Sequence, residues 1–581
     1  MAATLLILTI GIPWLGAVIV WMVGDRHPRW EHGLAVAFSV LTGAASLGLL
    51  AFASAKPVLD LPVGGVFDHF TFAADGLGVF LAAIAAVIGS LAVIFSVDYM
   101  QGETQLGRYY AFVLFFIGAM VGLVLTTNLL LMFVFWEITA LCSYALIAFH
   151  NDDPKAVAGG MKALIITQLS GVGLLAGALL LFAYQGNYDI PTFLQTHDLP
   201  AGVLAIMAFG CLAAAAAKSA QFPFQTWLPD AMEAPTPISA LIHAATMVNA
   251  GVYLLARFYP AFAEVPGWRT AVVVVGLLSA LLAAIMALTA VDLKRVLAYS
   301  TVSQLGFMVY AIGVGSVAAA SFHLFSHAIF KALLFLAAGA VIHAAGTRDM
   351  REMGGLGRQM PFVRTVFVIG ALALAGLPIL NVFWSKEYIL EVGLAGGPVW
   401  AWIGMLLVVG LTALYTFRCV WLVFYGQPRS HLHAHEAGPA MRVALAPLAL
   451  GALLSWLAAR PFFRMLSETL PFHGLEAETT GELVLNILEA PATWMALGVV
   501  AIGLLLWIFR ERVGWLVKLL HLPAQAARNS FGFEAINQGI VRGTKDAAEW
   551  LRGSQTGLLN WNVFGILAGL VILLAVLLGV R

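Results

Sequence analysis

The feature that most constrains this chain is a series of apolar stretches that recur along its 581 residues. Hydrophobic residues make up 61% of the sequence and charged residues only 10%, whereas soluble chains carry roughly 25% charged residues. A bilayer core takes about 20 apolar residues to cross. We count about sixteen such windows, from about Leu5 to Met22 through to a last one from about Leu558 to Val580. The sequence therefore predicts an all-α polytopic membrane protein and excludes a soluble domain.

Charge and cysteine content narrow the kinds of site that the chain can hold. Lys and Arg total 30, as do Asp and Glu, so the formal net charge is zero and gives no electrostatic reason to expect nucleic acid. The cysteines Cys142, Cys211 and Cys419 lie far apart in apolar stretches. This spacing matches neither an iron-sulfur nor a zinc site. We therefore expect no cofactor, metal or redox centre in this chain.

The positions of Lys and Arg predict the orientation. When the loops between the predicted spans are numbered along the chain, the odd-numbered loops collect Lys and Arg. The loop between Tyr188 and Ala201 is an even-numbered one and has no Lys or Arg. By the positive-inside rule both termini should face away from the cytoplasm. The first apolar segment has no basic residue before it and no small-residue cleavage site after it, so it reads as a retained span rather than a signal peptide.

Two long apolar segments are interrupted in a way that plain spanning helices avoid. The first reads CLAAAAAKSAQFPFQTWLPDAM, with Lys218 before a break at Phe222 and Pro223, and the second reads ALALAGLPILNVFWSKEYIL, with Gly376 and Pro378 before Lys386. Unwound backbone at mid-membrane is tolerated beside a protein-lined or wet cavity, so paired broken helices are typical of transporters built from repeats. Two proline kinks with no transport role are the plainer alternative.

These breaks predict an organisation in units of five spans. If each break belongs to one unit, fourth to eighth span and ninth to thirteenth, the odd number of spans places the two units in opposite orientation.

The tail after Ile508 mixes charged and apolar residues, which favours an amphipathic segment along the membrane surface, broken at Pro523 and Gly532. A loop with short helices is the alternative. The expected parts are a three-helix segment (1–100), a first repeat (105–260), a second repeat (268–425), additional helices (440–510), a lateral segment (511–556) and an anchor helix (557–581).

Several charged residues persist inside the apolar segments. Burying a charge in a bilayer costs at least about 2.5 to 3.5 kcal/mol, so such residues are functional by default. Glu137, Lys218 and Lys331 are the clearest examples. We expect the Glu137 carboxylate and the Lys218 ammonium to lie close together, because each would then offset the burial of the other.

Histidines near Lys331 suggest a path for protons. His323, His327 and Lys331 are spaced i, i+4 and i+8, which places them in one stripe along a helix. Two histidines in line with a lysine favour a proton relay over a structural role. His243 is alone in its helix, so a relay and a structural hydrogen bond remain equally open there.

A histidine-rich tract, HLHAHE at 431–436, resembles a metal-binding sequence. Its i, i+2, i+4 spacing is not that of a helical zinc site, and the tract lies in a polar loop. A solvated loop is therefore the favoured interpretation.

The chain resembles the proton-conducting antiporter-like subunits of complex I, Mrp-type cation/proton antiporters and membrane-bound hydrogenases. WLPDAMEAPTPISALIHAATMV, DLKRVLAYSTVSQLGFM and HAIFKALLFLAAGAVIH are similar to the most recognisable stretches of that family, and the likeness covers nearly the whole chain. Within the family it is nearest to the L-type subunit of complex I, an NADH-quinone oxidoreductase, because QTGLLNWN before the last span and HEAGPAMRVALAPLALGALLS resemble that subunit. The stretch TQLSGVG from Thr167 departs from the L pattern, since it lacks an acidic residue.

The resemblance assigns roles to the residues singled out above. It implies that Glu137 is the glutamate of the fifth span, Lys218 the lysine of the seventh, and His243 a relay in the eighth. It makes Lys331 the central lysine, and Lys386 the lysine of the second broken helix, at the proton exit. His323 and His327 lie beside the central lysine.

The resemblance also implies the setting of the protein. It predicts a multi-pass subunit of the inner (plasma) membrane that translocates protons, driven by redox chemistry in partner membrane subunits, with no catalytic centre in this chain. The alternatives are a subunit of an Mrp-type antiporter that exchanges sodium or potassium for protons, of a membrane-bound hydrogenase, or of an inorganic-carbon uptake complex. GTRDMREMGGL and DAMEAPTP lean toward the Mrp antiporter.

Overall fold

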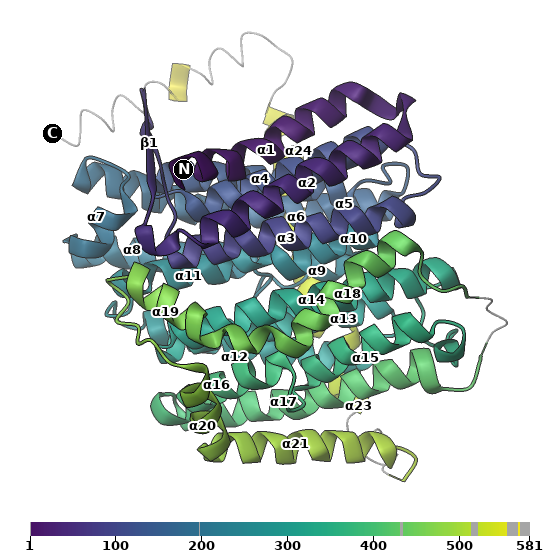
Figure 1. Ribbon diagram of the computed structural model, residues 1–581. Helices are drawn as coiled ribbons and strands as arrows, with labels where there is room; N and C mark the ends of the chain where they lie inside the picture. The colour runs from purple at the N-terminus through teal and green to yellow at the C-terminus, as the bar shows by residue number, and fades with distance from the viewer. Residues whose placement is uncertain (1, 197, 430–433, 513–520, 555–566, 570–581) are drawn as a thin grey trace. The chain divides into compact units, whose positions relative to one another are not determined.

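The computed structural model describes residues 2–196, 198–429, 434–512, 521–554 and 567–569 (Figure 1). The chain divides into two compact units, Met1–Ala524 and Gln525–Arg581. Among the described residues, 14 helices are long and apolar enough to cross a membrane. The chain is thus a predominantly helical, multi-pass membrane protein, as expected. Most of the last predicted span, Leu558 to Val580, lies outside the described residues.

The N-terminal segment contains three long helices and one element that the sequence analysis missed. The helices are α1 (Ala2–Val23), α2 (Pro28–Leu50) and α3 (Gly76–Tyr99), and α2 packs on both of the others. Between α2 and α3 the chain forms an antiparallel hairpin of β1 (Val58–Gly64) and β2 (Asp68–Ala73). Gly64 and Gly65 make its turn with positive φ, a glycine signal between alternating apolar residues that predicts a hairpin.

The first broken helix lies in the next group of elements, which Figure 1 draws in blue and teal. These are α4 (Leu106–Leu125), α5 (Leu129–Ile147), α6 (Pro154–Gln185), α7 (Ile190–Thr196), α8 (Ala201–Lys218), α9 (Trp227–Asp230), η3 (Ala231–Glu233), α10 (Thr236–Ala240), η4 (Leu241–Ala245) and α11 (Met247–Phe262). Helix α8 ends at Lys218, and helical structure resumes only at Trp227. The break therefore lies where Phe222 and Pro223 predict it.

The second broken helix lies in a comparable group. It comprises α12 (Trp268–Thr289), α13 (Leu293–Val314), α14 (Val317–Ala345), η5 (Leu356–Arg358), α15 (Pro361–Ala375), α16 (Asn381–Gly396), α17 (Val399–Val420) and η6 (Trp421–Tyr425). Gly376 follows α15 with φ +81°, a left-handed conformation that glycine adopts at no steric cost. The break between α15 and α16 thus also lies where the sequence predicts it.

The remaining described elements follow the second group. They are α18 (Pro439–Leu454), η7 (Ser455–Ala458), α19 (Ala459–Thr469), α20 (Thr480–Glu489), α21 (Pro491–Ile508), α23 (His521–Arg528), η8 (Ser530–Gly532) and α24 (Phe533–Ser554). The tail breaks at Gly532 as expected but not at Pro523, which lies within α23. Pro523 is the third residue of the described α23, and a proline in the first turn of a helix removes no intrahelical hydrogen bond.

Ion pairs and helix caps hold the connections at the two ends of the long helices. At one end, Arg348 pairs with Glu233 at 2.9 Å and with Asp292 at 3.1 Å. At the other end, Asp75 caps α3 by accepting from the Gly78 backbone and pairs with Arg257 of α11. These contacts fix the connections around the buried helices that carry the candidate site.

Candidate functional site

The first break brings Lys218 next to α5. Its ammonium is fully buried, donates to the backbone carbonyl of Trp136 at 2.7 Å and lies 4.9 Å from the centre of the Trp136 ring. Trp136 precedes Glu137, so Lys218 lies beside the segment that carries Glu137, and the two charged groups are close enough to interact electrostatically. Lys218 and Glu137 do not form a direct ion pair within 4.0 Å in the described structure. The lysine uses a backbone carbonyl as its acceptor instead.

The Glu137 carboxylate points toward α6. Its Oε1 lies so close to Gly171 that the Cβ of an alanine there would overlap it, and it has no hydrogen-bond partner among the described residues. The side chain of Gln168 lies within hydrogen-bonding range of the carboxylate. Both residues belong to the stretch TQLSGVG, so this stretch supplies neutral groups around the carboxylate.

The second break holds Lys386 in a different way. The lysine is fully buried and donates to the carbonyl of Ala375, the last residue of α15, at 3.1 Å. The last carbonyls of a helix lack intrahelical partners and carry partial negative charge, so they favour a cation. The next residue, Glu387, is 1% exposed, and both its carboxylate oxygens lack hydrogen-bond partners among the described residues.

Helix α14 carries the predicted stripe of His323, His327 and Lys331, and all three residues are fully buried. His323 bonds through Nδ1 to the Ser385 hydroxyl at 2.9 Å and through Nε2 to Oε1 of Gln304 at 3.1 Å. His323 therefore bridges α13 and α16, and its partner on α16, Ser385, is the residue before Lys386. Both ring nitrogens of His327 are without partners in the described residues.

Helix α13 links the two breaks. Lys331 donates to the Ser300 hydroxyl and lies 3.5 Å from the Leu297 carbonyl, both on α13. Gln221, in the first break, donates to the Val302 carbonyl at 3.2 Å. Among the candidate spans in the described residues, α13 is the least apolar, yet it is fully buried. A polar and fully buried helix of this kind needs polar partners. Gln221 of the first break and His323 and Lys331 of α14 supply them.

His243 lies apart from these contacts. It belongs to η4, a single π-helical turn, and such turns are frequent at functional sites. Its ring lies 6.1 Å from the Trp227 ring and 6.0 Å from the Phe335 ring, and neither ring nitrogen has a partner in the part of the chain that the structure describes. The structure thus offers no structural hydrogen bond for His243.

Sequence reasoning missed five polar residues of this site: Gln221, Ser300, Gln304, Ser385 and Glu387. The sequence signal was present for Glu387, because it is a charge in an apolar broken segment beside Lys386. The other four are neutral, and only tertiary packing gives them their partners: Gln221 meets α13, whereas Ser300, Gln304 and Ser385 meet α14. Of the tract at 431–436, His431 and His433 lie outside the described residues.

His473 is a buried titratable residue outside the spanning segments. His473 donates from Nε2 to the Ala256 carbonyl at 3.0 Å, beside the Asp75 and Arg257 pair. Burial, together with the positive charge of Arg257, lowers the pKa of His473 to about 4. Its imidazole is therefore neutral near neutral pH.

Comparisons with known proteins find relatives of the chain among membrane subunits of NADH:quinone oxidoreductases and Mrp antiporters. Residues 126–413 match the family described as "NADH:quinone oxidoreductase/Mrp antiporter, TM", and residues 61–110 match "NADH-Ubiquinone oxidoreductase (complex I), chain 5 N-terminus". The chain is 34% identical to NADH-quinone oxidoreductase subunit L of Escherichia coli, over 99% of this chain and 100% of that protein. It is 38% identical to F(420)H(2) dehydrogenase subunit L of Methanosarcina mazei, over 79% of this chain and 74% of that protein.

A solved structure also has this fold. A chain of the Mrp complex from Dietzia sp. DQ12-45-1b superposes with a TM-score of 0.85 at 29% identity and covers 99% of this chain. The present chain spans 63% of the length of that Mrp chain. The fold and the arrangement of its helices are therefore shared with a subunit of an antiporter assembly.

Proposed function

Because the chain belongs to the family of NADH:quinone oxidoreductase and Mrp antiporter membrane subunits, we propose that it translocates protons within a complex I type NADH-quinone oxidoreductase. In this proposal protons pass between Glu137, Lys218, His243, His323, His327, Lys331 and Lys386. Redox chemistry in partner subunits supplies the energy. The chain itself contributes the path for protons and holds no cofactor.

The observation that carries the proposal is the set of buried polar contacts centred on α13. Gln221 contacts α13 from the first break, Lys331 contacts it from α14, and His323 joins it to Ser385 beside Lys386. Unpaired polar groups in a bilayer are costly. A purely structural core would place apolar side chains here, so a row of hydroxyl, amide, imidazole and ammonium groups favours proton transfer.

Lys218 can change its protonation state during transport because its hydrogen-bond acceptor is a neutral carbonyl rather than a carboxylate. A carboxylate and an ammonium about 4 Å apart attract by on the order of 4 kcal/mol at an effective dielectric of 20, whereas moving one charge against ~150 mV costs about 3.5 kcal/mol. In the structure Lys218 contacts a neutral carbonyl, so closing the Glu137 and Lys218 pair would supply an attraction of the size that pumping requires. Partner subunits would drive that closure.

The proposal also covers the setting of the chain. We place it in the inner (plasma) membrane, among other membrane subunits of the assembly, with protons or sodium as the transported ion. We retain the six segments given above as its domain organisation, with the two five-span groups as inverted repeats.

Two alanine variants test the proposed route. We expect Lys218→Ala and Lys331→Ala each to leave the complex assembled and to abolish redox-coupled proton movement, because each removes a buried group that holds the transferred proton. Acidification in membrane vesicles measures the movement. Lys155→Ala, at an exposed lysine in the first turn of α6, is the matched control. Normal pumping in either buried variant would exclude the role given to that lysine.

A second candidate function rests on the Mrp likeness. Because an Mrp chain shares the fold over 99% of this chain, exchange of sodium or potassium for protons without redox partners is the alternative. A gentle-detergent pull-down of the tagged chain from native membranes, followed by mass spectrometry, separates the two. Flavin and iron-sulfur subunits in the eluate support the redox-driven pump, whereas small membrane subunits alone support the antiporter.

A further inference from the structure

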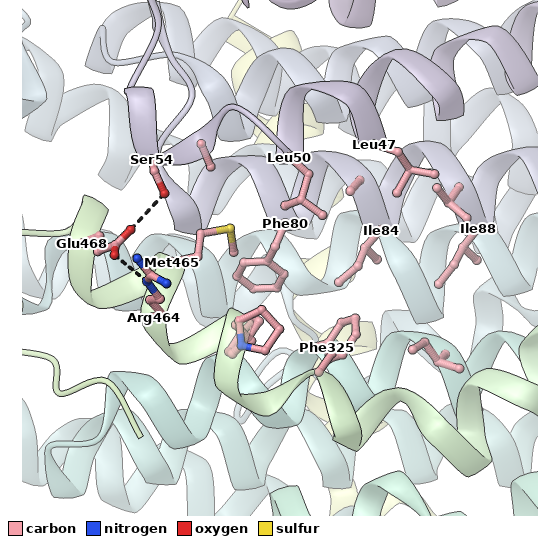
Figure 2. A pocket seen from close by; sticks show the side chains of 17 residues that line it. Leu47, Leu50, Ser54, Phe80, Ile84, Ile88, Phe325, Arg464, Met465 and Glu468 are labelled. Atoms are coloured by element: carbon pink, nitrogen blue, oxygen red, sulfur yellow. Dashed lines mark hydrogen bonds and ion pairs between the residues drawn. The ribbon is translucent and has the colours of Figure 1, made fainter. Parts of the chain in front are cut away.

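A groove of about 680 Å³ lies away from the buried polar contacts, between α2, α3, α14 and α19 (Figure 2). This volume is within the roughly 300 to 1,000 Å³ of sites that bind small molecules. Apolar side chains line most of it, among them Leu47, Phe80, Ile84 and Phe325. Apolar surface of this kind suits a hydrocarbon chain.

One end of the groove is polar. Figure 2 shows Glu468 between Ser54 and Arg464 at this end, whereas Leu47 and Ile88 lie toward the other end. The Glu468 carboxylate accepts from Arg464 Nε at 2.7 Å and from the Ser54 hydroxyl at 2.9 Å. The two Nη groups of Arg464 form no hydrogen bond with any described residue, and Lys56 is close enough to attract Glu468. This end therefore offers cationic donors and one carboxylate together.

The polar end lies where the spanning helices begin and end. Helix α2 ends at Leu50, α19 ends at Thr469, and α3 begins at Gly76, whose backbone amide donates to the Thr469 hydroxyl at 2.7 Å. From this end the groove follows α3 from Phe80 to Ile88, about 12 Å at 1.5 Å per residue. One leaflet contributes about half of a ~30 Å hydrocarbon core. The groove thus runs from a membrane boundary over most of one leaflet.

We propose that this groove binds one phospholipid with an amine-bearing, zwitterionic headgroup, such as phosphatidylethanolamine. An acyl chain lies along α3, the phosphate binds the Arg464 guanidinium and the Lys56 ammonium, and the headgroup amine binds Glu468. Free guanidinium N–H groups suit a phosphate, because charge-assisted hydrogen bonds to it are strong. Glu468 selects the headgroup, since a carboxylate attracts an ammonium and repels a purely anionic lipid.

The proposed lipid touches the back of the helix that carries the proton stripe. Phe325 and Ile329 line the groove from α14, whereas His323 and Lys331 of the same helix bond to Ser385 and Ser300 and do not line it. A bound acyl chain would fill the space behind α14 and restrict its movement. The site is independent of the proposed transport function, because it rests on the groove alone.

Photo-crosslinking tests the lipid site in the full chain within its assembly. The assembly is reconstituted in vesicles of equal parts phosphatidylethanolamine and phosphatidylglycerol, with a photoactivatable acyl chain on either lipid. We expect wild type to label with phosphatidylethanolamine on α3 or α19. Arg464→Gln should lower this labelling about tenfold, the loss of a charge-assisted hydrogen bond, whereas Glu468→Gln should shift the preference toward phosphatidylglycerol.

Two controls decide between a specific site and general contact with the bilayer. Arg460→Gln changes an exposed arginine on the same helix that does not line the groove, and it should label as wild type does. Ala83→Phe fills the groove from α3 and should abolish labelling, whereas Val40→Phe on the exposed face of α2 should not. Equal labelling of Arg464→Gln and Arg460→Gln, unchanged labelling of Ala83→Phe, or labelling of a neighbouring polypeptide instead of this chain would each overturn the proposal.

Discussion

The two broken helices solve the same problem in different ways. Each places a buried lysine close to the C-terminal end of a half-helix, where the partial negative charge of unpaired carbonyls favours a cation. Lys218 is itself the last residue of α8, and its ammonium reaches outward to the Trp136 carbonyl of α5. Lys386 lies in the following half-helix and reaches back across the break to Ala375. Both breaks therefore hold a buried cation, although the lysine precedes the first break in the sequence and follows the second.

The acidic residues of the two regions differ more. Glu137 is on a separate helix from Lys218 and is half-buried, whereas Glu387 adjoins Lys386 and is fully buried without a hydrogen-bond partner in the described structure. A buried charge that loses its counter-charge is strongly destabilising. The second region therefore depends more on having both charges present than the first does.

Substitution of one lysine at a time should cause a different loss of stability in each of the two regions. We expect Lys386→Met to destabilise the assembled protein by about 3 to 5 kcal/mol, the usual cost when a buried charge loses the opposite charge that lies near it. Lys218→Met should destabilise it less, because Glu137 is half-buried. Thermal unfolding followed by tryptophan fluorescence measures both, and both variants should lose proton movement.

A double variant provides the control for this difference. Lys386→Met combined with Glu387→Gln removes both charges, so it should recover most of the lost thermal stability while remaining inactive. An equal loss of stability in the single and double variants would show that Glu387 is not the source of the cost. The two regions would then be alike in their dependence on charge.

How far the sequence predicts this arrangement depends on how far apart the interacting residues lie. The spanning helices and both breaks follow from local apolar length and from Gly376 or Pro223, which act within their own segments. The buried charges Lys218, Lys331 and Lys386 were evident because a charge in an apolar window is costly anywhere. Gln304 and Ser385 were not, since a neutral side chain gains its role only from the helix that packs against it. The unpredicted part of the site is thus the part made by tertiary contact.

Substitution of His323, which bridges α13 and α16, should have a smaller effect on proton movement than loss of a lysine. His323→Phe keeps an aromatic ring in place but removes the hydrogen bonds to Gln304 and Ser385. Because a positioned proton-transfer group contributes about 10² to 10⁴ in rate, and water can replace part of it, we expect a fall of about tenfold or more in proton movement. Redox-driven acidification in vesicles measures it. Ser326→Ala, at a neighbouring buried position of α14, is the matched control and should retain near-normal rates.

His473 provides the smallest effect and tests whether pH sensitivity belongs to the transport route. Its pKa is lowered in the folded protein from about 6.5 to about 4, by burial and then by Arg257, so protonation favours the unfolded state. Its contribution to stability is complete above pH 6.5 and is lost as the pH falls toward 4.

At pH 5.5 the loss of stability should be about 1 kcal/mol, and His473→Gln should remove this pH dependence. Comparison of the unfolding temperatures at pH 7.5 and pH 5.5 measures this difference. Since His473 bonds to Ala256 beside the Asp75 and Arg257 pair, and to none of the proposed transfer residues in the described part of the chain, the pH dependence of proton movement should be the same in the variant and in wild type. A changed pH profile of transport would instead bring His473 into the route and extend the first region to that end of the helices.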